Sequence, residues 1–230
     1  MKTLLKIAAG LLAAVLLALS AGCVHPALAD SARLGPFFVP KNHAGDVSLG
    51  GVRRVVVLPI WAGPGAPAES AAALDAILVA ALQRENRFEV VTFSREECRR
   101  RYLADALSSS GALPPDLLDV LKREFAVDAV MFVDLTVFHA YKPLALGLRG
   151  KLATIDGTRL IWTFDNLFAA DDPAVANSAR RHFLNRDRSA PADLTPAVLQ
   201  SPAKFASYAA SAMFATLPPV LPPLAVARSR

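Results

Sequence analysis

The segment at positions 53–60, Arg-Arg-Val-Val-Val-Leu-Pro-Ile, carries a continuous apolar run after its two arginines, and it constrains the fold more than any other stretch of the chain. Its β-branched residues follow one another without a polar alternate. A strand built from them must therefore be covered on both faces, as in a parallel or mixed sheet between helices. Pro59 lacks the N–H that a ladder requires and predicts the end of the strand. We expect a central strand here, followed by a plain turn over residues 61–66.

Helix and strand patterns alternate after this strand, which favours a parallel sheet with helical crossovers. A helix is predicted after Pro67, where apolar residues recur at i, i+3, i+4, i+7 and i+8. A second strand is predicted over residues 88–91. Ser94, with Glu97 three residues later, forms the capping-box signature of a helix over residues 95–107. The residues expected to face the sheet are Leu74, Ile77, Leu78, Ala81 and Leu82 from the first helix, and Cys98, Tyr102, Leu103 and Leu107 from the second.

The rest of the chain adds a third helix over residues 116–125, a long strand over 128–140 and a hairpin of strands 143–155 and 159–165. Asp156 and Gly157 provide the turn of that hairpin. Helices are predicted over 172–185 and 201–216, with a loop over 187–200. We therefore expect an α/β fold: a mixed, mostly parallel central sheet of about five strands, ending in an antiparallel hairpin and flanked by helices. One core should hold Val55, Val57, Leu78, Leu82, Val133 and Trp162.

The N-terminus has the form of an export signal. Lys2 and Lys6 precede an apolar stretch, residues 7–19, that is short for a transmembrane span. The stretch ends in Leu-Ser-Ala-Gly-Cys, which resembles a bacterial lipobox and predicts lipidation of Cys23. Ordinary export, with cleavage after Ala29, is the alternative. The expected organisation is a signal peptide over 1–22, a tether over 23–51, one α/β domain over 52–217 and a proline-rich tail over 218–230.

The tether prediction rests on scattered proline and glycine without a sustained period. Phe37 and Phe38 leave open whether part of it docks on the domain. If flexible throughout, it would reach roughly 30 Å from the membrane. Val24 follows the cysteine, and under the sorting rule that retains lipoproteins carrying aspartate there, this predicts an outer-membrane lipoprotein of the cell envelope, facing the periplasm.

Charge excludes one class of partner. The formal net charge of +5 falls to +3 once Lys2 and Lys6 leave with the signal, which is too little for a nucleic-acid footprint. The basic run Arg99, Arg100 and Arg101 is either a solvated helix face or a weak candidate for contact with an anionic partner.

No residue pattern names a reaction. Ser201 and Lys204 match Ser-x-x-Lys, but the motifs that accompany it in known hydrolases are missing, and Ser201 is better explained as a helix N-cap. The histidines have no metal-ligand spacing: His25, His43, His139 and His182. Asp134, Asp156 and Asp165 either meet at one end of the sheet as an acid pair or cation site, or serve turns and solvent. We predict no catalytic residue, metal or cofactor.

The order of elements is similar to the small envelope lipoproteins of the curli-secretion-channel type. It comprises a lipobox, a Val-Val-Val-Leu-Pro strand, an amphipathic helix, Arg-Phe-Glu-Val-Val, Ala-Val-Asp-Ala-Val-Met-Phe-Val and a hairpin ending Leu-Ile-Trp. Penicillin-binding-protein activator lipoproteins and the N-terminal domain of the Tol translocation protein look related in the same way. The resemblance covers residues 52–168 and implies a mixed sheet that binds envelope partners. Two long amphipathic hairpins of the channel proteins are missing, and a homo-oligomer, as a ring or a dimer, stays open.

Two classes of function remain. The first is a non-enzymatic, membrane-anchored module that binds a periplasmic protein or peptidoglycan. The second is a small periplasmic hydrolase or ligand-binding enzyme of unrecognised type. Because the motifs are structural rather than catalytic, the sequence favours the first.

Overall fold

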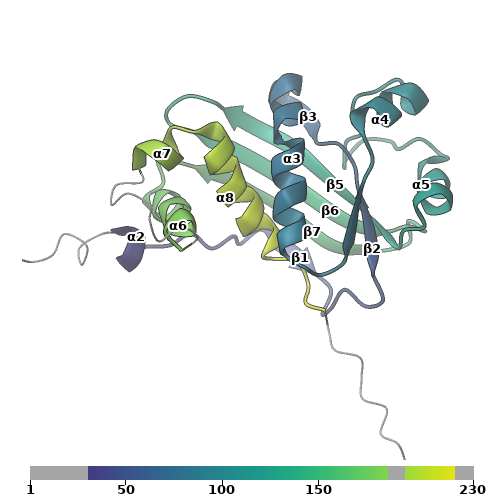
Figure 1. The fold of residues 1–230 in the computed structure, drawn as a ribbon, viewed down its shortest axis with the longest axis horizontal. Coiled ribbons are helices and arrows are strands. Elements are labelled where there is room, and N and C mark those ends of the chain that lie inside the picture. Colours follow the sequence, from purple (N-terminus) through teal and green to yellow (C-terminus); the bar gives the residue numbers. More distant parts are fainter. Residues whose placement is uncertain (1–30, 186–194, 221–230) are drawn as a thin grey trace, which may run out of the picture.

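The computed structural model describes residues 31–185 and 195–220, and in them one mixed sheet carries helices on both faces (Figure 1). The signal segment, Cys23 and residues 221–230 lie outside the described ranges. The strand order is β1-β7-β6-β5-β2-β4, and β3 also pairs with β5. The predicted α/β class is confirmed, with seven strands where about five were expected. These are β1 His43–Gly45, β2 Arg54–Val57, β3 Trp61–Gly65, β4 Glu89–Thr92, β5 Ala129–His139, β6 Ala145–Thr154 and β7 Leu160–Ala169.

Strand pairing is parallel in one half of the sheet and antiparallel in the other. β2 lies parallel to β4 and to β5, which confirms the predicted crossover from β2 to β4. β5, β6, β7 and β1 pair antiparallel in turn. The described sheet thus has as many antiparallel as parallel strand pairs, whereas a mostly parallel sheet was expected. The central position expected for β2 is wrong, because the long hairpin and β1 extend the sheet on the far side of β5.

The turn predicted over residues 61–66 is also wrong, since β3 occupies it. Trp61 pairs with Asp134, and Gly65 pairs with Val137 after a register shift. β5 is eleven residues long, whereas β2 has four. The second half of β5 therefore offers a free edge, and the chain returns to it after Pro59.

The larger core lies on the face covered by α3 (Ala68–Arg84), α6 (Pro173–Leu184) and α8 (Pro202–Phe214) (Figure 1). α7 (Thr195–Leu199) forms within the predicted loop over 187–200. All six predicted core residues are confirmed in this core: Val55, Val57, Leu78, Leu82, Val133 and Trp162.

An aromatic row on β7 fills the middle of this core. Trp162 stacks on Phe164 with ring centroids 5.9 Å apart, and Phe164 stacks on Phe168 at 6.3 Å. Gly150 on β6 lies against this row, because a Cβ there would sit 2.7 Å from the Trp162 ring. Leu160, at the start of β7, lies outside this core and is 54% exposed.

The opposite face is covered by α4 (Arg95–Tyr102) and α5 (Leu117–Phe125), over a smaller core that includes Val56 and Phe132. The capping box of Ser94 and Glu97 is confirmed. The predicted continuation to residue 107 is wrong, because Leu103 adopts a left-handed φ of 54° and ends the helix. Its side chain is 92% exposed and does not face the sheet. No helix of the described ranges has both the length and the apolar character to cross a membrane.

Much of the expected tether packs on the domain. α2 (Ser31–Leu34) contacts α6, and the Phe38 N–H donates to Ser178 Oγ at 2.8 Å. The Phe38 ring lies 5.3 Å from the Phe168 ring. Buried Leu49 donates its N–H to the Pro219 carbonyl at 3.1 Å, so the start of the expected tail is held as well. The tether prediction therefore fails for residues 31–51, which contribute β1 and a core residue.

Replacing a central side chain of α3 tests this core. Leu78 is 2% exposed, and Leu78→Ala should lower the free energy of unfolding by about 2 to 5 kcal/mol, because it leaves a cavity among packed side chains. Leu103→Ala, at an exposed position, should change it by less than about 0.5 kcal/mol. Chemical denaturation measures both. Equal effects of the two substitutions would place α3 outside the core.

Candidate binding pocket

The chain leaves β2 and β4 toward opposite faces of the sheet. After β2 it runs through β3 to α3, whose inner residues join the larger core. After β4 it enters α4, whose Cys98 joins the smaller core. In open α/β sheets, ligands bind outside the carboxyl ends of strands at such a reversal. A cavity of about 420 Å³ lies at this place, within the range of small-molecule sites.

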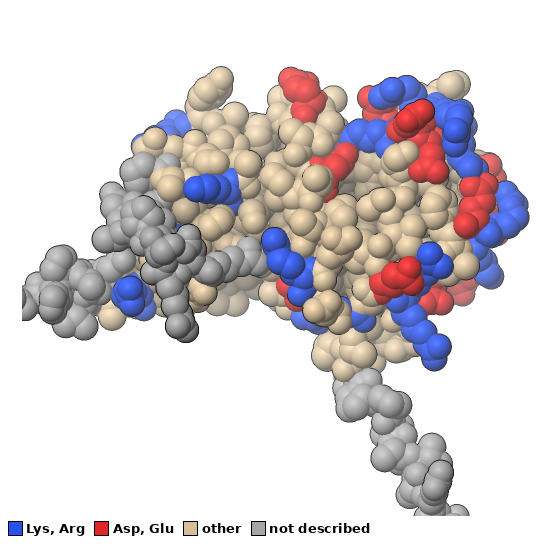
Figure 2. Space-filling model, in the orientation of Figure 1, with Lys and Arg blue, Asp and Glu red and all other residues tan. Residues whose placement is uncertain are grey.

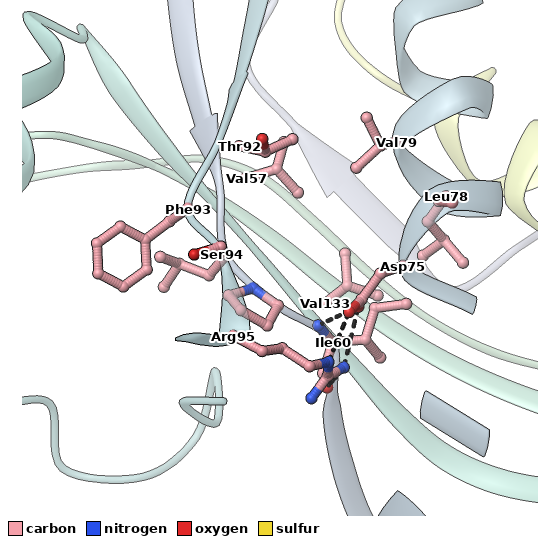
Figure 3. Close-up of a pocket in the computed structure, with 13 residues that line it drawn as sticks. Val57, Ile60, Asp75, Leu78, Val79, Thr92, Phe93, Ser94, Arg95 and Val133 are labelled. Atoms are coloured by element: carbon pink, nitrogen blue, oxygen red, sulfur yellow. Dashed lines mark hydrogen bonds and ion pairs between the residues drawn. The ribbon is translucent and has the colours of Figure 1, made fainter. Parts of the chain in front are cut away.

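The lining of this cavity is mostly apolar. Figure 3 shows it between α3 on one side and the end of β4 on the other, with Val57 and Val133 at the sheet. Its polar members are Asp75, Thr92, Ser94 and Arg95, and its apolar members are Val57, Leu58, Pro59, Ile60, Ala76, Leu78, Val79, Phe93 and Val133.

An ion pair forms the polar end of the cavity. Arg95 Nε lies 2.6 Å from Asp75 Oδ2, and Arg95 Nη2 lies 2.9 Å from Asp75 Oδ1. The same pair binds the backbone after Pro59: Ile60 N–H donates to Asp75 Oδ1 at 3.0 Å, and Arg95 Nη2 donates to the Ile60 carbonyl at 2.7 Å. The pair thus joins α3, the end of β2 and the start of α4, as the dashed lines in Figure 3 show.

These contacts decide what the cavity can do chemically. Asp75 and Arg95 satisfy each other, and Ser94 Oγ accepts the Glu97 N–H while donating to the Glu97 carboxylate at 2.9 Å. The cavity therefore presents paired charges and apolar walls rather than a nucleophile beside a base. It suits the burial of an apolar group.

Two of the three predicted aspartates share a row of the sheet, but they do not form an acid pair. Arg149 on β6 stands between Asp134 on β5 and Asp165 on β7, and its Nε donates to Asp165 Oδ2 at 2.8 Å. Asp134 is fully buried and accepts hydrogen bonds from the Ser109 N–H at 2.9 Å and the Ser109 hydroxyl at 2.7 Å. Lys151 Nζ donates to the Ser109 carbonyl at 2.6 Å. Asp134 thus holds the loop before α5 on the sheet.

Asp156 lies elsewhere, in the turn between β6 and β7. It accepts hydrogen bonds from the Thr154 hydroxyl and from the Thr158 N–H and hydroxyl, and these lower its pKa to about 2. It therefore serves the hairpin turn. No group of three or more potential metal ligands occurs in residues 31–185 and 195–220.

The arginines at 99 to 101 lie on α4 in a surface of mixed sign, and Figure 2 shows blue and red intermingled at the α4 and α5 end. Arg99 Nε bonds to Asp105 Oδ1 at 2.6 Å, and Arg101 makes two bonds to the Glu124 carboxylate on α5. These bonds raise the pKa of both guanidinium groups. In the described part of the chain, Arg100 has no ion pair. Of these three arginines, only Arg100 therefore has a positive charge that no carboxylate neutralises.

Ser201 caps α8, with its hydroxyl accepting the Lys204 N–H at 3.4 Å, as predicted for a helix N-cap. The histidines are dispersed: His43 is exposed on β1, His139 ends β5, and His182 contacts Phe183 on α6. His25 lies outside the described residues.

No protein-family model and no curated protein sequence matches the chain. Among solved structures, a PelC dodecamer from Paraburkholderia phytofirmans is similar, with TM-score 0.39, 12% identity and coverage of 72% of this chain and 93% of that chain. Lipoprotein GNA1162 from Neisseria meningitidis gives TM-score 0.38 and 13% identity over 60% and 97% of the chains. The LpoB C-terminal domain from Escherichia coli gives 0.35 and 16% over 50% and 81%.

One of these three structures is of a lipoprotein, and no curli-secretion or Tol protein is among the three. Likeness at this level transfers neither a partner nor an activity to this chain.

Sequence reasoning did not find Asp75 and Arg95. One signal could have pointed to Arg95. Ser94 caps a helix that starts directly after a parallel strand, and this places the next residue, Arg95, at the carboxyl end of the sheet. Asp75 lies 15 residues after Ile60 in the sequence, and only the packing of α3 brings them together.

Removing Asp75 tests the role of the ion pair. Asp75→Ala leaves Arg95 and the Ile60 N–H without their acceptor, and it should lower the free energy of unfolding by about 1 to 3 kcal/mol. Asp46→Ala, which removes an exposed pair with Arg159, should cost less than about 1 kcal/mol. Urea denaturation compares the two variants. A loss for Asp75→Ala no larger than for Asp46→Ala would contradict the assigned role.

Proposed function

We propose that this chain is a lipid-anchored module of the bacterial cell envelope that binds an envelope protein and has no turnover of its own. The observation that carries the proposal is the cavity beside α3, whose walls are apolar and whose charges are paired within the protein. Such a cavity takes up an apolar side chain of a partner at little desolvation cost.

The anchor is Cys23, on the sequence evidence of the lipobox. A chain from Cys23 to Ser31, the first residue of α2, spans at most about 28 Å when fully extended. The domain would therefore stay close to the membrane, on the periplasmic side of the outer membrane.

The partner surface is proposed around the mouth of the cavity and α4. β4 pairs with β2 alone among the described strands, so its outer edge can take up an extended segment of a partner. Arg100 on the adjoining α4 supplies a free positive charge. Of the predicted basic run, Arg99 and Arg101 contribute less, because Asp105 and Glu124 already neutralise them.

Substitution of the anchor residue tests the localisation. Cys23→Ser should yield protein that is uncleaved or released from the membrane fraction, since no thiol remains to carry lipid. Fractionation and mass spectrometry of the N-terminal peptide measure this. Unchanged membrane association, with an unlipidated N-terminus at Asp30, would favour ordinary export instead.

Filling the cavity tests the binding role. Ala76 is exposed at the cavity lining, and Ala80 is exposed one turn later on α3 without lining it. Ala76→Trp should reduce crosslinked co-purification of the partner from native membranes by at least about tenfold, as loss of a central contact does, whereas Ala80→Trp should retain it. Thermal melting checks that both variants fold.

Identical partner recovery by the two tryptophan variants would contradict the binding site. Turnover of a peptidoglycan or ester substrate by the purified protein, lost on substitution of Ser201 or Asp134, would instead establish the enzyme alternative.

A further inference from the structure

A second hollow lies at the end of the molecule where the N-terminal segment joins it. Figure 1 shows α2 beside α6 at one end of the long axis, with α4 and α5 at the other. Between α2 and α6 the surface is hollowed by about 200 Å³. The hollow is lined by Ala32, Arg33, Arg181, Leu184 and Asn185.

Its two arginines are exposed and available for an anion. Within residues 31–185 and 195–220, the guanidinium of neither Arg33 nor Arg181 forms a hydrogen bond or ion pair. The guanidinium of Arg181 lies 4.2 Å from the centroid of the Phe37 ring. The ring covers one face of the guanidinium, and the N–H donors in its plane remain free to bind an oxyanion in a fork.

The charge balance at this end favours an anion. On the face that Figure 2 shows, the described surface around α2, α6 and α7 displays Lys and Arg without Asp or Glu. The hollow lies near the C-terminus of α6, which carries about half a negative charge. Two guanidinium charges outweigh that helix-end charge.

An exposed apolar side chain adjoins the hollow. Leu34, which follows Arg33 on α2, is 69% exposed. Cationic groups beside exposed aliphatic side chains are the composition of protein surfaces that lie in the headgroup layer of a bilayer.

From these observations we propose that the α2 and α6 end, with Arg33 and Arg181 at its centre, docks on the phosphate groups of anionic phospholipids in the membrane that carries the anchor. This inference rests on the proposed lipidation of Cys23, since the short span from Cys23 to residue 31 holds this end near the headgroups. Docking orients the cavity beside α3 and the helix α4 away from that membrane.

Hydrogen exchange of the lipidated protein tests the proposal. The protein is reconstituted in vesicles of phosphatidylcholine alone and of phosphatidylcholine with phosphatidylglycerol. Exchange in residues 31–41 and 181–185 should slow severalfold only in the anionic vesicles. Each basic residue near an anionic surface changes the partition coefficient roughly fivefold, so the pair contributes about 25-fold. Raising the salt concentration should weaken the protection.

Matched variants separate charge from folding. Arg33→Glu with Arg181→Glu should abolish the protection, and Arg33→Lys with Arg181→Lys should retain it. Lys122→Glu with Arg123→Glu, on exposed residues of α5 at the far end, changes the net charge equally and should retain it too. Protection that ignores lipid charge, or that survives the Arg-to-Glu pair, would overturn the docking.

Mass spectrometry of the same sample distinguishes the two proposals. Lipid on Cys23 without protection overturns the docking and leaves the anchor standing. An unlipidated Cys23 overturns the anchor, and flotation of that protein with the two kinds of vesicle then decides the docking. Preferential flotation with anionic vesicles supports it, and equal flotation contradicts it.

Discussion

Pro59 supplies no hydrogen-bond donor, and the carboxyl end of the sheet is organised around that missing N–H. β2 ends at Val57, and the Leu58 N–H still donates to the Met131 carbonyl of β5 at 3.0 Å. The next backbone groups, those of Ile60, bond to side chains of α3 and α4 instead of to a neighbouring strand. The chain can then resume as β3 farther along β5. The break between β2 and β3, the Asp75–Arg95 ion pair and the cavity beside α3 therefore share one cause. Pro59 cannot donate to the neighbouring strand, so the backbone that follows it must find its hydrogen bonds elsewhere.

The parts of the fold that sequence predicted well are those whose signal is local and repeated. Nearby residues determine the structure in three cases: the apolar period of α3, the capping box at Ser94 and the hairpin turn at Asp156. β1, β3 and α7 are three to five residues long and have no such period. Their conformation comes from the elements they contact, as when β5 offers its free edge. Leu103 shows the converse, since an apolar residue at a helical spacing still ended outside the core.

The functional residues were harder to predict because their roles are set by partners far away in the sequence. Asp75 and Arg95 each look like an ordinary surface charge until the packing of α3 brings them together. Asp134 was named as a candidate for an acid pair or cation site, but the loop that covers it could not be inferred. Arg99 and Arg101 looked like a basic surface, whereas Asp105 and Glu124 turn them into links within the protein.

The docking of residues 31–51 would also give a chain anchored through the proposed lipid on Cys23 a mechanical property. Tension from the N-terminal side first loads the contacts of α2 and Phe38, and next the three-residue ladder between β1 and β7. These contacts lie at the edge of the molecule and can give way in turn while the pairing of β2 with β4 and β5 stays intact. Residues 31–51 thus form a reserve of chain that spans roughly 70 Å when fully extended, and its release would lengthen the proposed link to the membrane before the centre of the sheet bears any load.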